Sequence, residues 1–514
     1  MSRKTAMSGK FASACRWSVL LGCLIMLGGL IGLLSRPSLY DQHFVRMDLV
    51  AAAFVVFGVA AAVVRKVAVK AAIWLIIISG IAIQAVGFTA PPAHSSDIYR
   101  YMWDGQVQAA GVDPYLYAPS DAALVSLRND YLWGPWTATP PRGTGLQYCV
   151  TNDHSKRGPA FDTVVGCSRI NRTNAPTIYP PVTEAWFTAV YLVAGDSSSM
   201  PMQVAMSLCA VLTTLVLLWG LRKMGGDPRL VALWAWCPTA TLEVGNDGHS
   251  DVLGTLLCAI ALIVLATART RRKTLLGGVL FGLALATKLT PAFLMPSTLK
   301  RGWGSILGAA GTVTFLVYLP HVLAVGRHIV GFFPTYLQEQ GYSSGTGYEI
   351  LALLVRGKLA SVVAFALLGL VALAVLRYSH PDQPWRGAIY MMAAALVIGT
   401  PQFEWYSMLL VMLVVLDGRW EWLALPAGAY LSNDPFITST TLIDYNRQVG
   451  YAGGLVVALV ITGLRYLHAR RDRGTGTRTG TEIRPAEALP LEALPAETML
   501  PETMPVPSPV TTAS

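Results

Sequence analysis

Long apolar stretches without charge set the first limit on how this chain can fold. Residues 71–90 contain no charged side chain, and a similar stretch begins at Trp17. A helix of about 20 residues crosses a bilayer hydrocarbon core of about 30 Å. Only 13% of the residues are charged, against about 25% in soluble domains. Because a soluble fold would need one very large core almost free of charge, we predict an all-α polytopic membrane protein.

The apolar pattern repeats along the chain and predicts a bundle of about 12–14 transmembrane or re-entrant helices. Most of these helices should be simple crossings, whereas the segment 275–298 needs a separate account. The predicted spans lie at about 17–34, 48–64, 71–90, 202–221, 229–243, 251–268, 305–323, 359–376, 387–400, 406–416, 421–432 and 450–466.

The net charge of +10 is explained by where the basic residues fall. With a cytoplasmic N-terminus, the short basic connections, such as Arg65–Lys66 and Arg271–Lys273, face the cytoplasm, as the positive-inside rule expects. This placement requires no nucleic-acid partner. Both termini are then cytoplasmic and the long polar loops are extracytoplasmic. No clear cleavage site follows Leu34, so we expect the first span to be retained rather than removed as a signal peptide.

The segment 275–298 is apolar but is flanked by basic residues at both ends, by Lys273 and by Lys300. A single crossing would break the positive-inside pattern, so we predict two half-helices that meet at TKLTP. Pro291 removes a backbone donor there and disfavours helical geometry in the residue before it. Lys288 would then lie at the turn, near the outer side or in a cavity.

One large loop, residues 91–200, dominates the predicted extracytoplasmic side. It is too long for a simple connector, and its aromatic content argues against disorder. Cys149 and Cys167 lie in this loop, where disulfides persist, so we predict a bridge between them. The apolar stretch 180–195 is short and is interpreted as an interfacial or tucked-in helix.

The remaining parts of the chain are its two ends. Residues 1–16 are predicted to form a basic cytoplasmic N-terminus, ahead of a transmembrane domain over residues 17–466. Residues 467–514 are rich in Pro, Glu and Thr and have no apolar face. We therefore predict that 467–514 is a disordered cytoplasmic tail.

A run of acidic and aromatic residues follows the third predicted span, in the sequence HSSDIYRYMWDG. A helix should start at Asp97 and end at Gly111. Spacings of four and seven residues put Asp97, Tyr101 and Asp104 on one face of this helix. Asp97 can serve as a helix cap, as the ion-pair partner of Arg100 or as a catalytic carboxylate.

Three further positions hold polar groups where lipid or an interface is expected. Lys288 either reaches the interface or awaits an anion such as a lipid phosphate. His249 and Asp251, in GNDGHSD, suit a hard cation, substrate hydrogen bonds or an ordinary turn. Glu404 and Trp405, in PQFEWY, suit an aromatic belt at the membrane interface or a sugar site in which rings stack and carboxylates bind hydroxyls.

These segments together resemble the polytopic glycosyltransferases of the GT-C type. The resemblance covers about residues 15–465, and it is closest to actinobacterial mannosyltransferases that use polyprenol-phosphate-mannose. The motifs that carry it are SDIYRYMWDGQVQAAGVDPYLYAP, TIYPPVTE, GHSDVLG, ATKLTPAFLMP and PQFEWY.

The resemblance implies an inverting sugar transfer in which Asp97 acts as the general base. GT-C enzymes commonly carry this acid after the first span, whereas here it follows the third, so Asp41 and Asp48 remain alternatives. Lys288 and Arg100 are expected to hold the donor phosphate. The residues expected to bind substrate are Tyr101, Asp104, Tyr179, His249, Asp251, Glu404 and Trp405.

The implied partners are a polyprenyl-phosphate-sugar donor, a glycolipid or cell-envelope glycan acceptor, and the lipid bilayer. The scheme requires no cofactor, although the GNDGHSD cluster keeps a divalent metal as a less favoured alternative. A transporter or flippase of a polyprenyl-linked glycan is the alternative function, because broken helices and intramembrane charges also suit transporters. The concentration of polar features on one side favours the enzyme, and no ATP-binding motif supports ATP-driven transport.

Overall fold

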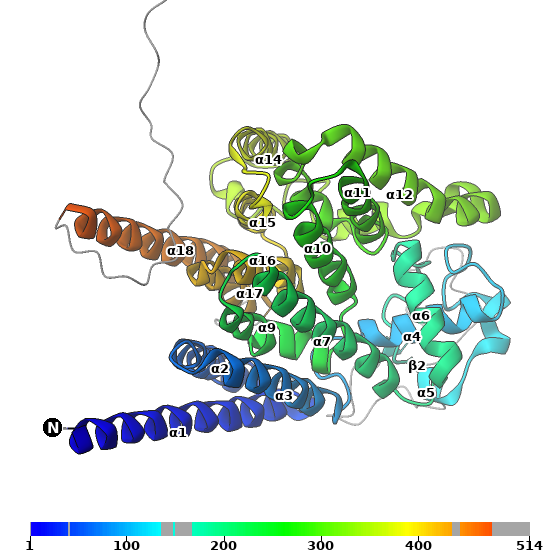
Figure 1. Cartoon of the computed structure of the whole chain (residues 1–514). Coiled ribbons are helices and arrows are strands. Elements are labelled where there is room, and N and C mark those ends of the chain that lie inside the picture. The colour runs from blue at the N-terminus through cyan, green and yellow to red at the C-terminus, as the bar shows by residue number, and fades with distance from the viewer. Residues whose placement is uncertain (1, 40–41, 135–147, 150–166, 434–442, 475–514) are drawn as a thin grey trace, which may run out of the picture. The chain divides into compact units, whose positions relative to one another are not determined.

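The protein is described by a computed structural model, and its placed residues are 2–39, 42–134, 148–149, 167–433 and 443–474. The chain divides into two units, Met1–Thr462 and Gly463–Ser514. Within the described residues the first unit is helical apart from one pair of two-residue strands (Figure 1). The predicted all-α class is therefore confirmed.

Seven segments of the described residues are long and apolar enough to cross a bilayer. This confirms a multi-pass membrane protein. Six of these segments lie within α1 (Ser2–Leu34), α2 (His43–Val64), α3 (Val69–Phe88), α7 (Met200–Lys223), α14 (Lys358–Tyr378) and α18 (Ile443–Gly474). The seventh, Trp303–Glu339, begins with α12 (Trp303–Val325) and continues beyond its end.

The other predicted spans are shorter helices or broken ones. Residues 229–243 do not form one helix, because Pro238 lacks the backbone N–H that would continue it, and a π-helix, Leu242–Asn246, follows. Single π-turns often mark functional sites. The short helices are α8 (Ala232–Ala235), α9 (Pro238–Thr241), α10 (Asp251–Ala266), α11 (Arg271–Leu285), α13 (Phe333–Glu339), α15 (Pro384–Gly399), α16 (Met408–Asp417) and α17 (Ala424–Asn433).

The segment 275–298 agrees with the prediction in its first half only. Helix α11 ends at Leu285, and the chain continues through 3₁₀ turns at Thr290–Ser297 rather than through a second α-helical half. Pro291 and Pro296 each remove a donor that an α-helix would need. Helix α11 packs closely on α12, since a Cβ at Gly278 would lie 2.7 Å from the carbonyl oxygen of Ile306.

The large loop folds into α4 (Asp97–Ala109), α5 (Asp130–Trp133), β1 (Tyr148–Cys149), β2 (Cys167–Ser168) and α6 (Pro181–Ala194). Helices α4 and α6 lie side by side (Figure 1). A Cβ at Gly105 would lie 2.6 Å from the carbonyl oxygen of Phe187, so only glycine permits this approach. The ring of Tyr101 stacks on Phe187 at 4.4 Å, which fixes the rotation of α4.

Strands β1 and β2 pair antiparallel, with Cys149 opposite Cys167. The side chains of both cysteines fall outside the described part, so the disulfide stays a prediction. Residues 475–514, most of the predicted tail, also lie outside it. Cys209, Cys237 and Cys258 are buried free cysteines, as expected of small packing residues.

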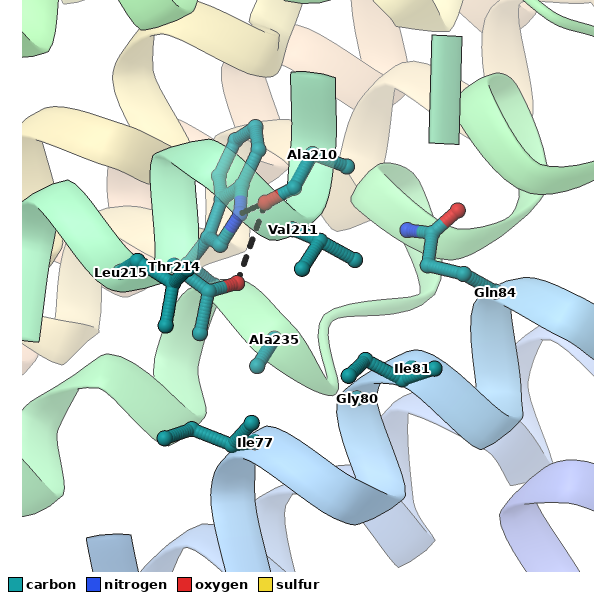
Figure 2. Close-up of a pocket in the computed structure, with 10 residues that line it drawn as sticks. Ile77, Gly80, Ile81, Gln84, Ala210, Val211, Thr214, Leu215 and Ala235 are labelled. Atoms are coloured by element: carbon teal, nitrogen blue, oxygen red, sulfur yellow. Dashed lines mark hydrogen bonds between the residues drawn. The ribbon is translucent and has the colours of Figure 1, made fainter. Parts of the chain in front are cut away.

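A small gap lies between α3 and the segment that contains α7 and α8, and Figure 2 shows its lining. Its volume is about 10 Å³, enough for one water molecule at most. The indole Nε1 of Trp234 and the hydroxyl of Thr214 both donate to the carbonyl oxygen of Ala210, each at 3.1 Å. The gap is small and its lining is mostly apolar, so we interpret it as a packing defect and turn to the end of α3, where α4 begins.

Candidate active site

Helix α4 begins at Asp97, as the sequence predicted. The N–H of Asp97 donates to Oγ of Ser95 at 3.2 Å, so Ser95 satisfies one backbone donor at the start of the helix. The Asp97 side chain is 20% exposed, whereas Tyr99, Arg100 and Tyr101 of the same turn are buried. The Asp97 carboxylate is therefore partly exposed, whereas the side chains that follow it in the first turn are buried.

Two groups from distant segments contact the Asp97 carboxylate. Nδ2 of Asn171 donates to Oδ1 at 2.6 Å, and Nδ1 of His249 lies 3.9 Å from Oδ2. The first distance is a short charge-assisted hydrogen bond, and the second is beyond hydrogen-bond range. One oxygen of Asp97 is thus held in place while the other has no hydrogen bond to His249.

His249 is fully buried between charged and aromatic groups. Its ring stacks on Trp405 with centroids 3.8 Å apart, and its Nε2 lies 3.6 Å from Oε2 of Glu243. Neither ring nitrogen has a hydrogen-bond partner. Burial lowers the pKa of His249, against the opposing effect of Asp97 and other carboxylates, so the imidazole is neutral at pH 7.

Lys288 and Asp251 form an ion pair at the same site. Asp251 opens helix α10, and Lys288 lies just after the end of α11. The ammonium also lies 4.9 Å from the ring centroid of Tyr406, whose hydroxyl is 2.5 Å from that of Tyr336. The Lys288 side chain is 20% exposed, so the cation is not completely buried.

Arg172 is a cation of this site that the sequence analysis did not identify. It pairs with Glu339 at 3.1 Å and lies 5.8 Å from the ring centroid of Tyr336. The charges of Asp97 and Glu339 outweigh the effect of burial and raise the pKa of Arg172. Its neighbour Asn171 was also not predicted, although the polar run NRTN, two residues before TIYPP, was the available signal.

Arg100 and Asp104, predicted to bind phosphate and substrate, are instead paired with each other at 2.8 Å. Both side chains are buried, and Nη1 of Arg100 donates to the carbonyl oxygen of Ala175 at 2.9 Å. This geometry favours a role in fastening the loop around Ala175 to α4. Among the described residues, Arg172, which interacts electrostatically with Asp97, and Lys288, which interacts with His249, remain as candidate phosphate-binding cations.

The carboxyl group of Glu184, on α6, lies beside this pair. Thr177 donates to its Oε1 at 2.6 Å, and the side chain is fully buried. Burial, reinforced by the charge of Asp104, raises the pKa of Glu184 well above its usual value. Glu184 is thus a buried acid that favours its protonated form.

Tyr101 and Tyr179 meet edge to face, with ring centroids 5.0 Å apart. Burial, followed by the charge of Asp97, raises the pKa of both hydroxyls. Both tyrosines therefore stay protonated next to Asp97, where their hydroxyls can donate to an oxygen.

Glu404 and Trp405, predicted to bind sugar, are buried behind the site. Trp405 stacks on Phe403 at 4.4 Å as well as on His249. Its ring therefore packs the wall of the site instead of offering an open face. Glu404 acts electrostatically on Glu243, which places it among the buried acids.

The two alternative bases predicted from the sequence are Asp41 and Asp48. Asp48 is an exposed residue of α2, and Asp41 is not among the described residues. Of the predicted site residues, the structure brings Asp97, Tyr101, Tyr179, His249, Asp251 and Lys288 close to one another.

Comparison with known proteins adds one finding. Residues 178–401 match Glycosyltransferase family 87. This region includes Tyr179, His249, Asp251 and Lys288, whereas Asp97 and Asn171 precede it. No curated protein and no solved structure matches the chain. Together with the seven candidate spans, the match identifies the chain as a multi-pass membrane glycosyltransferase that is similar to family 87 over residues 178–401.

Proposed function

We propose that this glycosyltransferase moves a sugar, mannose in the first instance, from a polyprenyl-phosphate carrier to a hydroxyl of a glycolipid or cell-envelope glycan. The transfer would take place on the extracytoplasmic face and invert the anomeric carbon. The observation that carries the proposal is the partly exposed Asp97 carboxylate, which lies near Arg172 and shares the neighbour His249 with Lys288. A base, two cations and a membrane-spanning scaffold are what this reaction needs.

In the proposed step, Asp97 takes the proton of the acceptor hydroxyl as that oxygen attacks the anomeric carbon. A bond forms between the acceptor oxygen and the anomeric carbon, and the bond from that carbon to the phosphate oxygen breaks. The electron pair leaves with the lipid phosphate. Because the leaving group is already a stable anion, the site needs no acid to protonate it.

The leaving phosphate needs positive charge, which Lys288 and Arg172 can supply. Each of these cations is paired with an acid, Asp251 and Glu339 respectively. The pairs keep the cations oriented before the donor binds. The hydroxyl of Tyr336 lies 2.5 Å from that of Tyr406. Arg172 lies near the ring of Tyr336, and Lys288 lies near the ring of Tyr406. The two tyrosines therefore connect the positions of the two cations.

The test is sugar transfer by purified, detergent-solubilised protein, with radiolabelled polyprenyl-phosphate-mannose and a membrane glycolipid extract. Wild type should transfer label, and Asp97→Asn should lose a factor of about 10² or more. Asp130→Asn is the matched control, because Asp130 is an exposed acid of the same loop. It should transfer label at the wild-type rate.

Equal transfer by wild type and Asp97→Asn would remove Asp97 as the base and direct the search to Asp48 and Asp251. Transfer from a nucleotide-sugar instead of the lipid-linked donor would contradict the donor class. Competing unlabelled polyprenyl-phosphate sugars, added to the same assay, identify which sugar the enzyme prefers.

A further inference from the structure

The turn that carries Glu243, Asp247 and His249 gathers three metal-ligating side chains inside the protein. One ligand atom of each lies within 4.8 Å of the others, and all three are buried. The exposed fractions of the side chains are 2%, 1% and 0%. The proposed sugar transfer does not use this group, so its purpose needs another explanation.

The backbone of the turn produces this grouping. Glu243 lies in the π-helix Leu242–Asn246, and Gly248 has a φ of +67° that reverses the chain after Asp247. The N–H of His249 then donates to the carbonyl oxygen of Glu243 at 2.8 Å. The side chains of Asp247 and His249, four and six positions after Glu243, therefore lie close to that of Glu243. An uninterrupted α-helix would not bring all three together.

His249 gives an independent sign that something is bound there. Both of its ring nitrogens are buried without a hydrogen bond, although buried polar groups are nearly always paired. Nε2 lies 3.6 Å from Oε2 of Glu243, which is too far for a hydrogen bond. Two atoms that bind one metal ion at about 2.1 Å, with a roughly tetrahedral angle between them, lie about 3.4 Å apart. The observed spacing is that of two ligands of one ion.

Buried carboxyl groups crowd around the turn and offer oxygen ligands to a cation. Glu243, Asp247 and Glu404 are all buried acids, and Arg46 offsets part of their charge. Asp247 uses Oδ1 to accept backbone N–H groups, including that of His94 at 2.9 Å. Its Oδ2 lies 3.5 Å from Nδ1 of His94, which is a long contact for a hydrogen bond.

We infer that Glu243, Asp247 and His249 form a binding site for one divalent cation of the Mn²⁺ or Zn²⁺ type. Two carboxylates and an imidazole are the mixed oxygen and nitrogen donors that such ions accept. The ion lies behind the site, one imidazole ring away from Asp97. It orients His249 and adds positive charge behind the opening, and so acts as a positioning element.

The experiment measures binding of Mn²⁺ to full-length protein in detergent after chelator treatment, by electron paramagnetic resonance of the free ion. Wild type should bind about one Mn²⁺ per chain, and bound metal should raise the Tm. Glu243→Gln and His249→Phe should lose this binding by at least about tenfold. Both variants are close in shape, and the Phe ring can still stack on Trp405. Asp382→Asn is the matched control, because Asp382 is a half-exposed acid that pairs with Arg301 and Arg269, outside the cluster, and it should bind Mn²⁺ as wild type does.

Binding by wild type and Asp382→Asn, with loss in both other variants, supports the site. The inference is overturned if wild type binds neither Mn²⁺ nor Zn²⁺, or if Glu243→Gln and His249→Phe bind as tightly as wild type. Each variant's Tm without metal shows whether a loss of binding comes from unfolding. Because the measurement uses no sugar donor, it can succeed or fail independently of the proposed transfer reaction.

Discussion

Nδ2 of Asn171 lies 2.6 Å from Oδ1 of Asp97 and donates a hydrogen bond to it. The two residues are 74 positions apart, and the large loop folds back to bring them together. The bond fixes the plane of the carboxylate and leaves Oδ2 as the oxygen without this constraint. A general base needs such an orientation, because its effect depends on reach to the hydroxyl that it deprotonates.

The first prediction concerns this hydrogen bond. Asn171→Ala should lower the kcat of sugar transfer by about 10-fold to 100-fold with little change in KM, since a hydrogen bond to a charged group contributes about 1.5–3 kcal/mol. The measurement is steady-state transfer by wild type and variant. In the Asp97→Asn background the same change should have almost no further effect, because both residues act through one carboxylate. Additive losses in the double variant would contradict this relationship.

The second prediction concerns the cation at the end of α11. Lys288→Gln should lower kcat/KM for the lipid-linked donor by about 10²–10³, the usual loss for one group that stabilises a leaving anion. It should also lower the Tm, because the nearly buried Asp251 loses its partner. The double variant Lys288→Gln with Asp251→Asn should regain Tm but not transfer. If the double variant also regains transfer, Lys288 serves only to neutralise Asp251.

The third prediction concerns the stability of the large loop as pH changes. The pKa of Glu184 is raised well above its unfolded value of 4.5, so between these two values the folded state holds a proton that the unfolded chain has released. Its contribution to stability is therefore complete below about pH 4.5 and is lost as pH rises through the folded pKa. Glu184→Gln, which cannot titrate, should remove this part of the pH dependence.

The measurement is the Tm of wild type and Glu184→Gln in detergent across a series of pH values. The wild-type Tm should fall relative to that of Glu184→Gln as pH rises. Asp130→Asn, at an exposed position of the same loop, should follow the wild-type curve. Parallel curves for wild type and Glu184→Gln would mean that Glu184 titrates normally.

The membrane architecture and the start of α4 were predictable because both depend on neighbouring residues. Apolar stretches such as 71–90 specify spans by length alone, and the residues before Asp97 specify a helix start. The break in 229–243 was also signalled, by Pro238, although the apolar count outweighed it in the prediction. The second half of 275–298 was misjudged because Pro291 and Pro296 favour 3₁₀ turns over a second helix.

The partners of each charged residue were not predictable from local sequence. Spacing along α4 suggested that Asp97, Tyr101 and Asp104 act together, yet Asp104 is taken by Arg100 on the same helix. Trp405 looked like a sugar-stacking residue, but its ring is packed against His249. Such outcomes depend on which distant segment fills the space beside each group.

The sequence by itself determined that this protein is a helical membrane protein with acids and aromatic residues after its third span. Length, apolarity and capping decide these features within one stretch of chain. Only the tertiary structure decided that Asn171 holds Asp97, that Lys288 meets Asp251, and that Glu243 and Asp247 converge on His249. The physical reason is that charges buried in a membrane protein must find partners, and those partners come from whichever segments the packing brings together.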